Sequence, residues 1–237
     1  MRLRAPLRSP SHGLDVATAA YARASPPGNR TPWRQAGWCV VDFELTGLNP
    51  RDDEIISFGA IPVDDGRVRL VEASSALVRP AREIEEAAIR VHGIRAVDLA
   101  DAPRLADAIA PLIETIAGRG LVFHTVAVDR PFLKRALAEK GARLRGPIVD
   151  TEVLGRLWLY ERDGRLRRRL GLAELATSLG LPAEHPHDAL SDALTTAQAF
   201  IALASHLDAL HRETVGSLAR ADRRVDALAL VEDHSRS

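Results

Sequence analysis

A short apolar run that ends in two acidic residues constrains the fold of this chain most strongly. Residues 38–41 are predicted to form a buried strand, and they lead directly into Asp42-Phe43-Glu44. Because side chains alternate along a strand, Asp42 and Glu44 point to the same face. Two carboxylates so placed raise each other's pKa unless a cation lies between them. The pair therefore suits a hard divalent metal ion, with a solvated strand end as the alternative.

Turn signals divide the residues that follow into further strands. Residues 54–63 and 67–78 are predicted to be the second and third strands, joined by a hairpin turn at 64–66. The short apolar segments 120–123 and 147–149 are predicted to be the fourth and fifth. Three antiparallel strands, followed by strands that alternate with helices, predict an α/β fold with a mixed five-stranded sheet flanked by helices.

Helical periodicity fills the intervals between these strands and the residues after them. Glycines end several of the segments, and one long apolar helix is expected near the C-terminus. The predicted helices cover residues 83–91, 105–116, 150–160, 172–179, 189–207 and 211–230, and a further helix starts near Arg130.

Composition divides the chain into three predicted parts. Residues 1–36 are expected to be a flexible N-terminal arm with a short helix near residues 14–24, and an organelle transit peptide is the alternative. Residues 37–210 are predicted to be the main domain. Residues 211–237 are predicted to be a C-terminal helix and tail.

The charge balance limits the kinds of partner. Lys+Arg and Asp+Glu are both 32, so a globally basic nucleic-acid-binding protein is not indicated. Affinity for nucleic acid would have to come from local charge, of which residues 162–169 are the most basic segment, or from bound metal. Cys39 is the only cysteine, which fits a cytoplasmic protein in a reducing compartment. No apolar run approaches the roughly 20 residues of a membrane helix.

Two further segments carry candidate catalytic side chains. His124 ends the predicted fourth strand, and Asp129 follows at a helix start, where it either caps the helix or faces a metal ion. His187 is expected at the very start of the long helix, and Asp192 in its second turn. With a reference pKa of about 6.5, an imidazole can take a proton from water at neutral pH. Alone, the His187–Asp192 pair also fits a surface histidine beside a solvated acid.

In combination, these motifs resemble a known family. Asp-x-Glu on a strand, an Asp at a helix start and His-x4-Asp, in this order, resemble the DEDDh-type 3′→5′ exonucleases. That family includes the proofreading epsilon subunit of bacterial DNA polymerase III, ribonuclease T and oligoribonuclease. The resemblance extends over about residues 38–207, and it includes the segments around His92-Gly93 and Asp150-Thr151. It implies a ribonuclease-H-like fold.

The resemblance also implies a mechanism, which is the release of 5′-mononucleotides from 3′ ends by two-metal-ion hydrolysis. Asp42, Glu44 and Asp192 would hold one divalent ion, and Asp42 would bridge to a second ion about 3.5–4 Å away. Asp129 would complete the acidic cluster, and His187 would be the general base. Mg²⁺ is the expected ion, and Mn²⁺ is expected to substitute.

Five residues are implied to contact the terminal nucleotide. Thr46, Gly47 and Leu48 form the turn after the acidic pair, and Leu48 would press on the base. His92 would belong to the same pocket, or would instead fix the turn that follows it. His124 is the fifth implied substrate-binding residue.

Single-stranded DNA with a free 3′ end is the expected substrate. An RNA substrate is the alternative, because discrimination depends on contacts to the 2′-hydroxyl that the sequence does not locate. A DNA polymerase is a candidate partner, and no membrane association is expected. A non-catalytic interaction module is the contrasting hypothesis, against which the complete set of four carboxylates and His187 argues.

Overall fold

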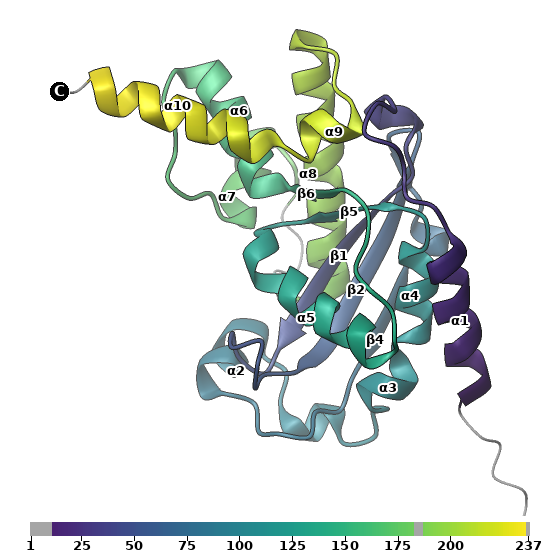
Figure 1. The fold of residues 1–237 in the computed structure, drawn as a ribbon. Helices are drawn as coiled ribbons and strands as arrows, with labels where there is room; N and C mark the ends of the chain where they lie inside the picture. The colour runs from purple at the N-terminus through teal and green to yellow at the C-terminus, as the bar shows by residue number, and fades with distance from the viewer. Residues whose placement is uncertain (1–10, 183–186, 236–237) are drawn as a thin grey trace, which may run out of the picture.

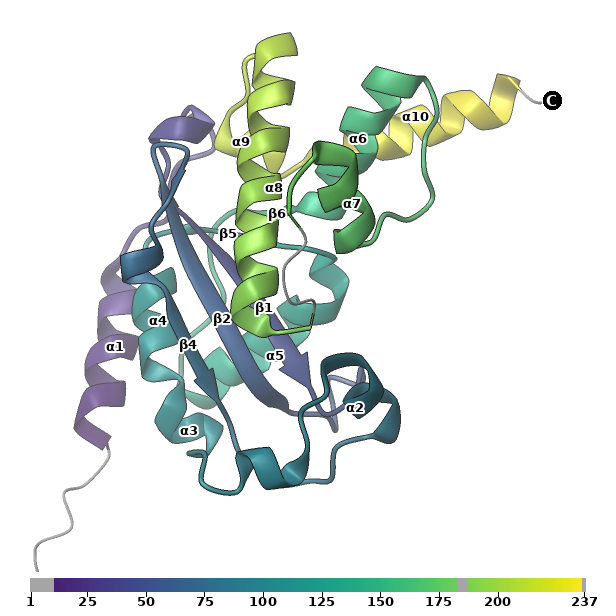
Figure 2. The ribbon, with the colours of Figure 1, turned by 180° about the vertical axis from the view of Figure 1, so that it is seen from behind.

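The computed structural model describes residues 11–182 and 187–235. A mixed β-sheet lies between two layers of helices (Figures 1 and 2). Its strands are β1 (Trp38–Leu45), β2 (Ile55–Asp64), β3 (Arg67–Val68), β4 (Ser74–Leu77), β5 (Gly120–Phe123) and β6 (Ile148–Asp150).

The helices pack on both faces of this sheet. The long α8 crosses one face over β1 and β2, whereas α4 and α5 cover the other face (Figures 1 and 2). The helices are α1 (Ser11–Arg23), α2 (Glu86–His92), α3 (Leu105–Ala108), α4 (Ala110–Ile116), α5 (Val126–Glu139), α6 (Thr151–Asp163), α7 (Leu172–Leu179), α8 (Ala189–Leu210), α9 (Val215–Leu218) and α10 (Ala221–Ser235).

The strand order is β3-β2-β1-β5-β6, and β4 also pairs with β2. β2 is antiparallel to β1, whereas β5 and β6 run parallel to β1, as the sequence predicts. The described sheet has six strands instead of five, because the predicted strand 67–78 is divided. Val68 pairs with Val63, and Ser74 pairs with Ala60. Residues 70–72, between these two paired stretches, form a turn of 3₁₀ helix that separates β3 from β4.

The predicted helix 105–116 is also divided, into α3 and α4. Pro111 lies at the start of α4 and has no N–H to continue the hydrogen-bond ladder of α3. The apolar face is nevertheless continuous, and Ile109, Leu112 and Ile113 are all fully buried. The periodicity therefore identified the buried face correctly but not the break.

Alternation along β1 assigns its side chains to two cores. Trp38 and Val40 pack in the cluster on the α8 side of the sheet. Cys39 and Val41 pack in the cluster with α4 and α5. Asp42 continues the first series, so its side chain projects toward α8. This confirms the predicted alternation and determines which helix can complete the site.

The first and last described helices pack against other helices. α1 lies along α4 (Figure 1), and its Ala17 and Tyr21 are buried. The predicted C-terminal helix is divided into α9 and α10, and α10 contacts α6. The division of the chain into three parts stays a prediction. Among the described residues, no helix is long and apolar enough to span a bilayer.

Candidate metal centre and nucleotide site

Three carboxylates meet at the end of β1. Asp42 and Glu44 come from the strand, and Asp192 comes from the first turn of α8. One oxygen from each lies within 4.8 Å of the others, and within the described chain these three are the group that could hold a metal ion. Asp129 is 4% exposed and lies close enough for its charge to act on Asp42. The structure thus brings the four predicted acidic residues into one region.

A glycine on the neighbouring strand lets α8 approach this cluster. Gly59 of β2 is paired with Asp42 of β1. A Cβ at Gly59 would lie 2.3 Å from the backbone oxygen of Ala189, the first residue of α8. Only a residue without a side chain allows this contact, and the contact places Asp192 next to the strand that carries Asp42.

The environment raises the pKa of each clustered carboxyl group. Loss of hydration is the largest cause for all four residues, and neighbouring negative charges add to it for each of them. The pKa of Glu44 rises to about 7 and that of Asp129 to about 8. The pKa of Asp42 rises well above its usual range. Buried carboxylates in this number form a donor set that a divalent cation would neutralise.

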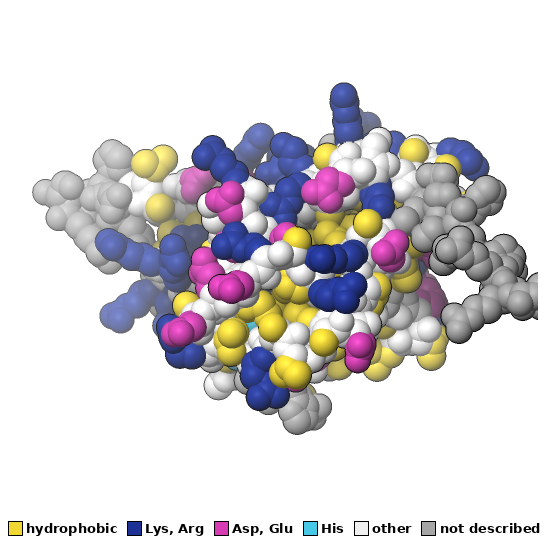
Figure 3. Space-filling model, turned by 90° about the horizontal axis from the view of Figure 1, so that it is seen from below, with side chains coloured by type: hydrophobic (Ala, Val, Ile, Leu, Met, Phe, Trp, Pro, Cys, Tyr) yellow, Lys and Arg dark blue, Asp and Glu magenta, His cyan; other side chains and the backbone are white. Residues whose placement is uncertain are grey.

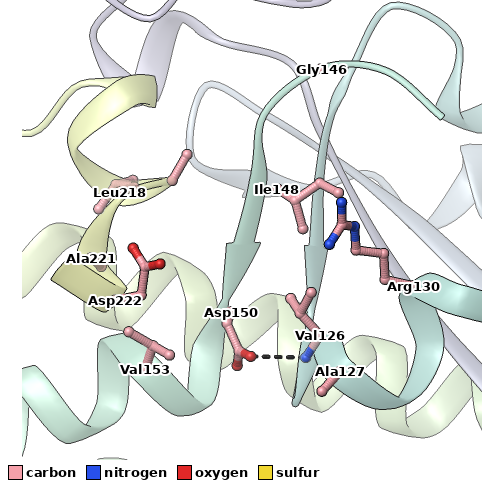
Figure 4. Close-up of a pocket in the computed structure, with 11 residues that line it drawn as sticks. Val126, Ala127, Arg130, Gly146, Ile148, Asp150, Val153, Leu218, Ala221 and Asp222 are labelled. Atoms are coloured by element: carbon pink, nitrogen blue, oxygen red, sulfur yellow. Dashed lines mark hydrogen bonds between the residues drawn. The ribbon is translucent and has the colours of Figure 1, made fainter. Parts of the chain in front are cut away.

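Asp129 does not cap its helix, so that alternative is wrong. α5 begins at Val126 and not near Arg130, which places Asp129 within the first turn. The cap comes from Asp150, which accepts hydrogen bonds from the backbone N–H groups of Thr125 and Val126 at 3.1 and 2.8 Å. Figure 4 shows this carboxylate pointing at Val126 from the end of β6. Asp129 is therefore free to face the acidic cluster.

His187 lies just before α8 and is exposed. The helix begins later than predicted because Asp188 caps it, accepting a hydrogen bond from the N–H of Ser191 at 2.9 Å. His187 adopts a left-handed backbone with φ of 70°, and its backbone N–H donates to Asp192 at 2.9 Å. The acidic residue thus fixes the backbone of the histidine, while the imidazole stays accessible.

An apolar cavity of about 390 Å³ adjoins the acidic cluster. Glu44 lies at its acidic side, and Leu48, Val91, His92 and Val128 contribute to its lining. Leu48 is 74% exposed, and its contact with a nucleotide stays a prediction. Figure 3 views the end of the molecule near α2 and α3, where exposed apolar surface lies between basic and acidic side chains.

The turn after Glu44 is held from inside the protein. Thr46 is fully buried, and its hydroxyl donates to Asp53 at 2.9 Å. A Cβ at Gly47 would lie 2.5 Å from the Asp53 carboxylate. Asp53 also pairs with Arg82 at 3.0 Å. Asp53 was not predicted as a site residue, because its role depends on these contacts and it looks like an ordinary turn residue in the sequence.

The two remaining predicted histidines are held by the protein itself. The His92 Nδ1 accepts from the N–H of Ile94 at 3.0 Å, and Nε2 lies 3.3 Å from the oxygen of Leu45. These contacts agree with the alternative that His92 fixes the turn that follows it, although the ring also lines the apolar cavity. The Nδ1 of His124 lies 2.9 Å from the Thr151 hydroxyl, and burial lowers the pKa of His124. Substrate contact by His124 stays a prediction.

A larger cavity of about 560 Å³ lies elsewhere, between the start of α5, β6 and the turn from α9 to α10 (Figure 4). Its polar side chains are Asp150, Arg130 and Asp222. None of the four clustered carboxylates lines it. This cavity is therefore distinct from the one beside the acidic cluster.

Comparison with known proteins agrees with this geometry. Residues 39–200 match a family model described as Exonuclease. The chain belongs to the DEDDh-type exonuclease family. The match includes Asp42, Glu44, Asp129 and Asp192, and it ends within α8.

Relatives of the chain include bacterial proteins whose names refer to DNA polymerase III. A DNA polymerase III subunit epsilon-like protein of Rhodobacter capsulatus is 33% identical over 193 residues, which is 79% of the chain and 26% of that protein. The DNA polymerase III subunit epsilon of Aquifex aeolicus is 28% identical over 169 residues, covering 71% of the chain and 80% of that subunit. The chain thus spans about a quarter of the Rhodobacter relative's length.

Solved structures share the fold. Exonuclease X, in complex with 5′ overhanging duplex DNA, is 23% identical with a TM-score of 0.59, and the match covers 78% of the present chain and 98% of exonuclease X. Escherichia coli exonuclease I, in complex with a dT13 oligonucleotide, is 19% identical with a TM-score of 0.61. This match covers 75% of the present chain and 42% of exonuclease I. These likenesses confirm the ribonuclease-H-like fold.

Proposed function

We propose that this exonuclease removes 5′-mononucleotides stepwise from the 3′ ends of single-stranded DNA by metal-dependent hydrolysis. The observation that carries the proposal is the meeting of Asp42, Glu44 and Asp192 within 4.8 Å, beside an apolar cavity. The cluster supplies acidic ligands, and the cavity has the apolar lining that a terminal base requires.

The residues present fit divalent cations. Asp42, Glu44 and Asp192 would hold one ion, Asp42 would share a second, and Asp129 would complete the negative surroundings. Mg²⁺ is the proposed ion because it prefers oxygen ligands, with Mn²⁺ as a substitute. When bound, the ions would activate the attacking water and stabilise charge on the attacking and leaving oxygens.

His187 is the proposed general base. Its backbone is held by the Asp192 carboxylate, whereas its ring is exposed at the start of α8. An imidazole so placed can take a proton from a water molecule at the cluster and release it to solvent. The left-handed backbone at His187 turns the chain sharply just before the helix.

The apolar cavity is the proposed site of the terminal base. Leu48, Val91 and Val128 offer apolar surface, and the buried Thr46–Asp53 contact keeps the Leu48 turn in place. Apolar contact with a base face does not distinguish one base from another. The exonuclease should therefore remove all four nucleotides.

DNA is favoured over RNA because the relatives are named as DNA polymerase III components. A polymerase partner is proposed on the same basis. An exoribonuclease acting on RNA 3′ tails is the second candidate. A non-catalytic module bound to a polymerase is the third, and the clustered carboxylates argue against it.

The test uses single-stranded DNA and RNA of the same sequence, labelled at the 5′ end and incubated with Mg²⁺. Stepwise shortening of DNA at more than ten times the rate for RNA is expected. A faster rate on RNA would establish the exoribonuclease alternative. A ladder that appears only with a 3′-label, or cleavage of a 3′-blocked strand from its 5′ end, would contradict the proposed direction.

A further inference from the structure

We propose that the loop between α6 and α7 binds the phosphate backbone of the single strand upstream of its 3′-terminal nucleotide. The contacts would come from Arg165, Arg168 and Arg169, which are named here the arginine loop. This inference rests on the proposed function and adds the route that the substrate takes away from the metal centre.

The arginine loop is a local positive charge on a chain of zero net charge. Residues 162–169 hold five arginines and one aspartate. Two of those arginines are paired, Arg162 with Asp163 at 2.6 Å and Arg167 with Glu174 at 3.0 Å. The arginine loop makes no ion pair or hydrogen bond to any residue that the structure describes, and all three of its side chains are exposed.

Hydrogen bonds connect this loop to the helix that carries Asp129. The loop ends at the buried Leu170, whose N–H donates to Glu152 at 3.3 Å. The other oxygen of Glu152 accepts from the Thr125 hydroxyl at 3.1 Å. Thr125 immediately precedes α5, and Asp129 lies in the first turn of that helix. The loop is therefore fixed relative to the acidic cluster.

The two ribbon views place the loop on the same side of the molecule as the end of β1. α7 and the chain leading into it lie beside the start of α5, and α2 lies further along that side (Figures 1 and 2). α1 lies on the opposite side. A strand whose terminal nucleotide occupies the cavity by α2 can continue past α5 toward α7 and the arginine loop.

Electrostatics explains why positively charged side chains would be needed away from the acidic cluster. The acidic cluster repels phosphates that are not neutralised by bound metal, so upstream phosphates need positive charge elsewhere. Arginine suits this role because its planar guanidinium donates two parallel hydrogen bonds to a phosphate. Such contacts read no base identity, so affinity should depend on strand length and salt concentration, not on sequence.

The test compares two substrates on the Arg165→Ala/Arg168→Ala/Arg169→Ala variant. On single strands of about twenty nucleotides, KM should rise about tenfold or more with kcat unchanged. The slope of log KM against log salt concentration should decrease by about 2, as expected for three lost phosphate contacts. On the p-nitrophenyl ester of thymidine 5′-monophosphate, which has no upstream phosphates, the variant should match the wild type. Arg23→Ala/Arg30→Ala, which removes exposed arginines at α1 and after it, should change neither substrate.

Several results would overturn the proposal. An unchanged KM on the long strand would show that the arginine loop makes no contact with substrate. An equal loss on the ester would show that the substitutions disturb the active site. If the wild type cleaves neither substrate, the proposed function fails. The loop is then judged by anisotropy binding of a labelled strand to the Asp42→Ala protein, where the triple substitution should weaken binding about tenfold or more; equal binding would overturn the proposal.

Discussion

Gly59 and Ala189 touch at the point where α8 meets the sheet. A Cβ added to Gly59 would lie 2.3 Å from the oxygen and 2.6 Å from the carbonyl carbon of Ala189. Gly59 is also the residue paired with Asp42 across β1 and β2. A close backbone contact therefore sets the distance between the two elements that supply the carboxylates.

Gly59→Ala should separate these elements. The obstructing atoms are backbone atoms, so the start of α8 has to move and carry Asp192 away from Asp42. We expect a loss of Mg²⁺-dependent cleavage of at least tenfold, with the Mg²⁺ requirement raised. Gly171→Ala is the matched control, because a Cβ there meets nothing within 4 Å. Equal activity in both variants would contradict the positioning role.

Asp150 should affect the same site indirectly, through the start of α5. Its carboxylate accepts three backbone hydrogen bonds, two from the start of α5 and one from Glu152 at 2.9 Å. Asp150→Ala should lower the free energy of unfolding by about 1–2 kcal/mol, as a lost helix cap does. It should also reduce cleavage, because α5 carries Asp129.

Thermal unfolding and cleavage of the Asp150→Ala variant check this prediction. Asp163→Ala is the control, since Asp163 is exposed and its ion pair among the described residues is with the neighbouring Arg162. A melting temperature for Asp150→Ala equal to that of the control would show that the cap contributes little.

The metal-free protein should lose stability as pH rises. The folded pKa is about 7 for Glu44 and about 8 for Asp129, above the ordinary carboxyl values near 4. Below pH 4 both carboxyls are protonated in the folded and unfolded states, so the shifts have no effect. Between pH 4 and 8 the unfolded chain releases these protons first, and stability falls.

Melting temperatures in chelator at pH 5 and pH 8 test this sign. Each 1 kcal/mol shifts the midpoint of a domain this size by about 2–4 °C. Asp129→Asn should flatten the fall, and Mg²⁺ should raise the melting temperature more at pH 8 than at pH 5. A metal-free protein that becomes more stable toward pH 8, relative to Asp129→Asn, would contradict the raised pKa.

Cys39 should be inert in the folded protein. It is the only cysteine, it is fully buried in β1, and burial raises the pKa of its thiol to about 12. Because the thiolate is the reactive form, a disulfide reagent at pH 8 should react only after unfolding. Stoichiometric reaction within minutes in buffer, at the same rate as in denaturant, would show that β1 is accessible.

Local patterns predicted much of the site. The alternation of Asp42 and Glu44 needs only the strand, and the end of the strand in a glycine turn is visible in the sequence. Asp129 was predicted at the start of a helix and Asp192 within one, although α5 and α8 begin at residues other than those expected. Both differences come from carboxylates, Asp150 and Asp188, that act as caps.

The remaining features depend on contacts between distant segments. Gly59 has its role only because α8 crosses β2, and the sequence around it reads as an ordinary strand. Asp53 is 1% exposed, yet it lies in a turn that looks solvated. The division of residues 67–78 follows from the pairing of both halves with β2. No local pattern reports such pairings before the fold is known.

Manganese binding tests whether the carboxylates at the end of β1 form the metal centre. Electron paramagnetic resonance measures the Mn²⁺ left free in solution as protein is added, for the wild type and for Asp42→Ala. We predict that the folded wild type binds Mn²⁺ at pH 8 and that Asp42→Ala loses both this binding and cleavage. Equal binding by the two proteins, or cleavage by Asp42→Ala at the wild-type rate, would contradict the account.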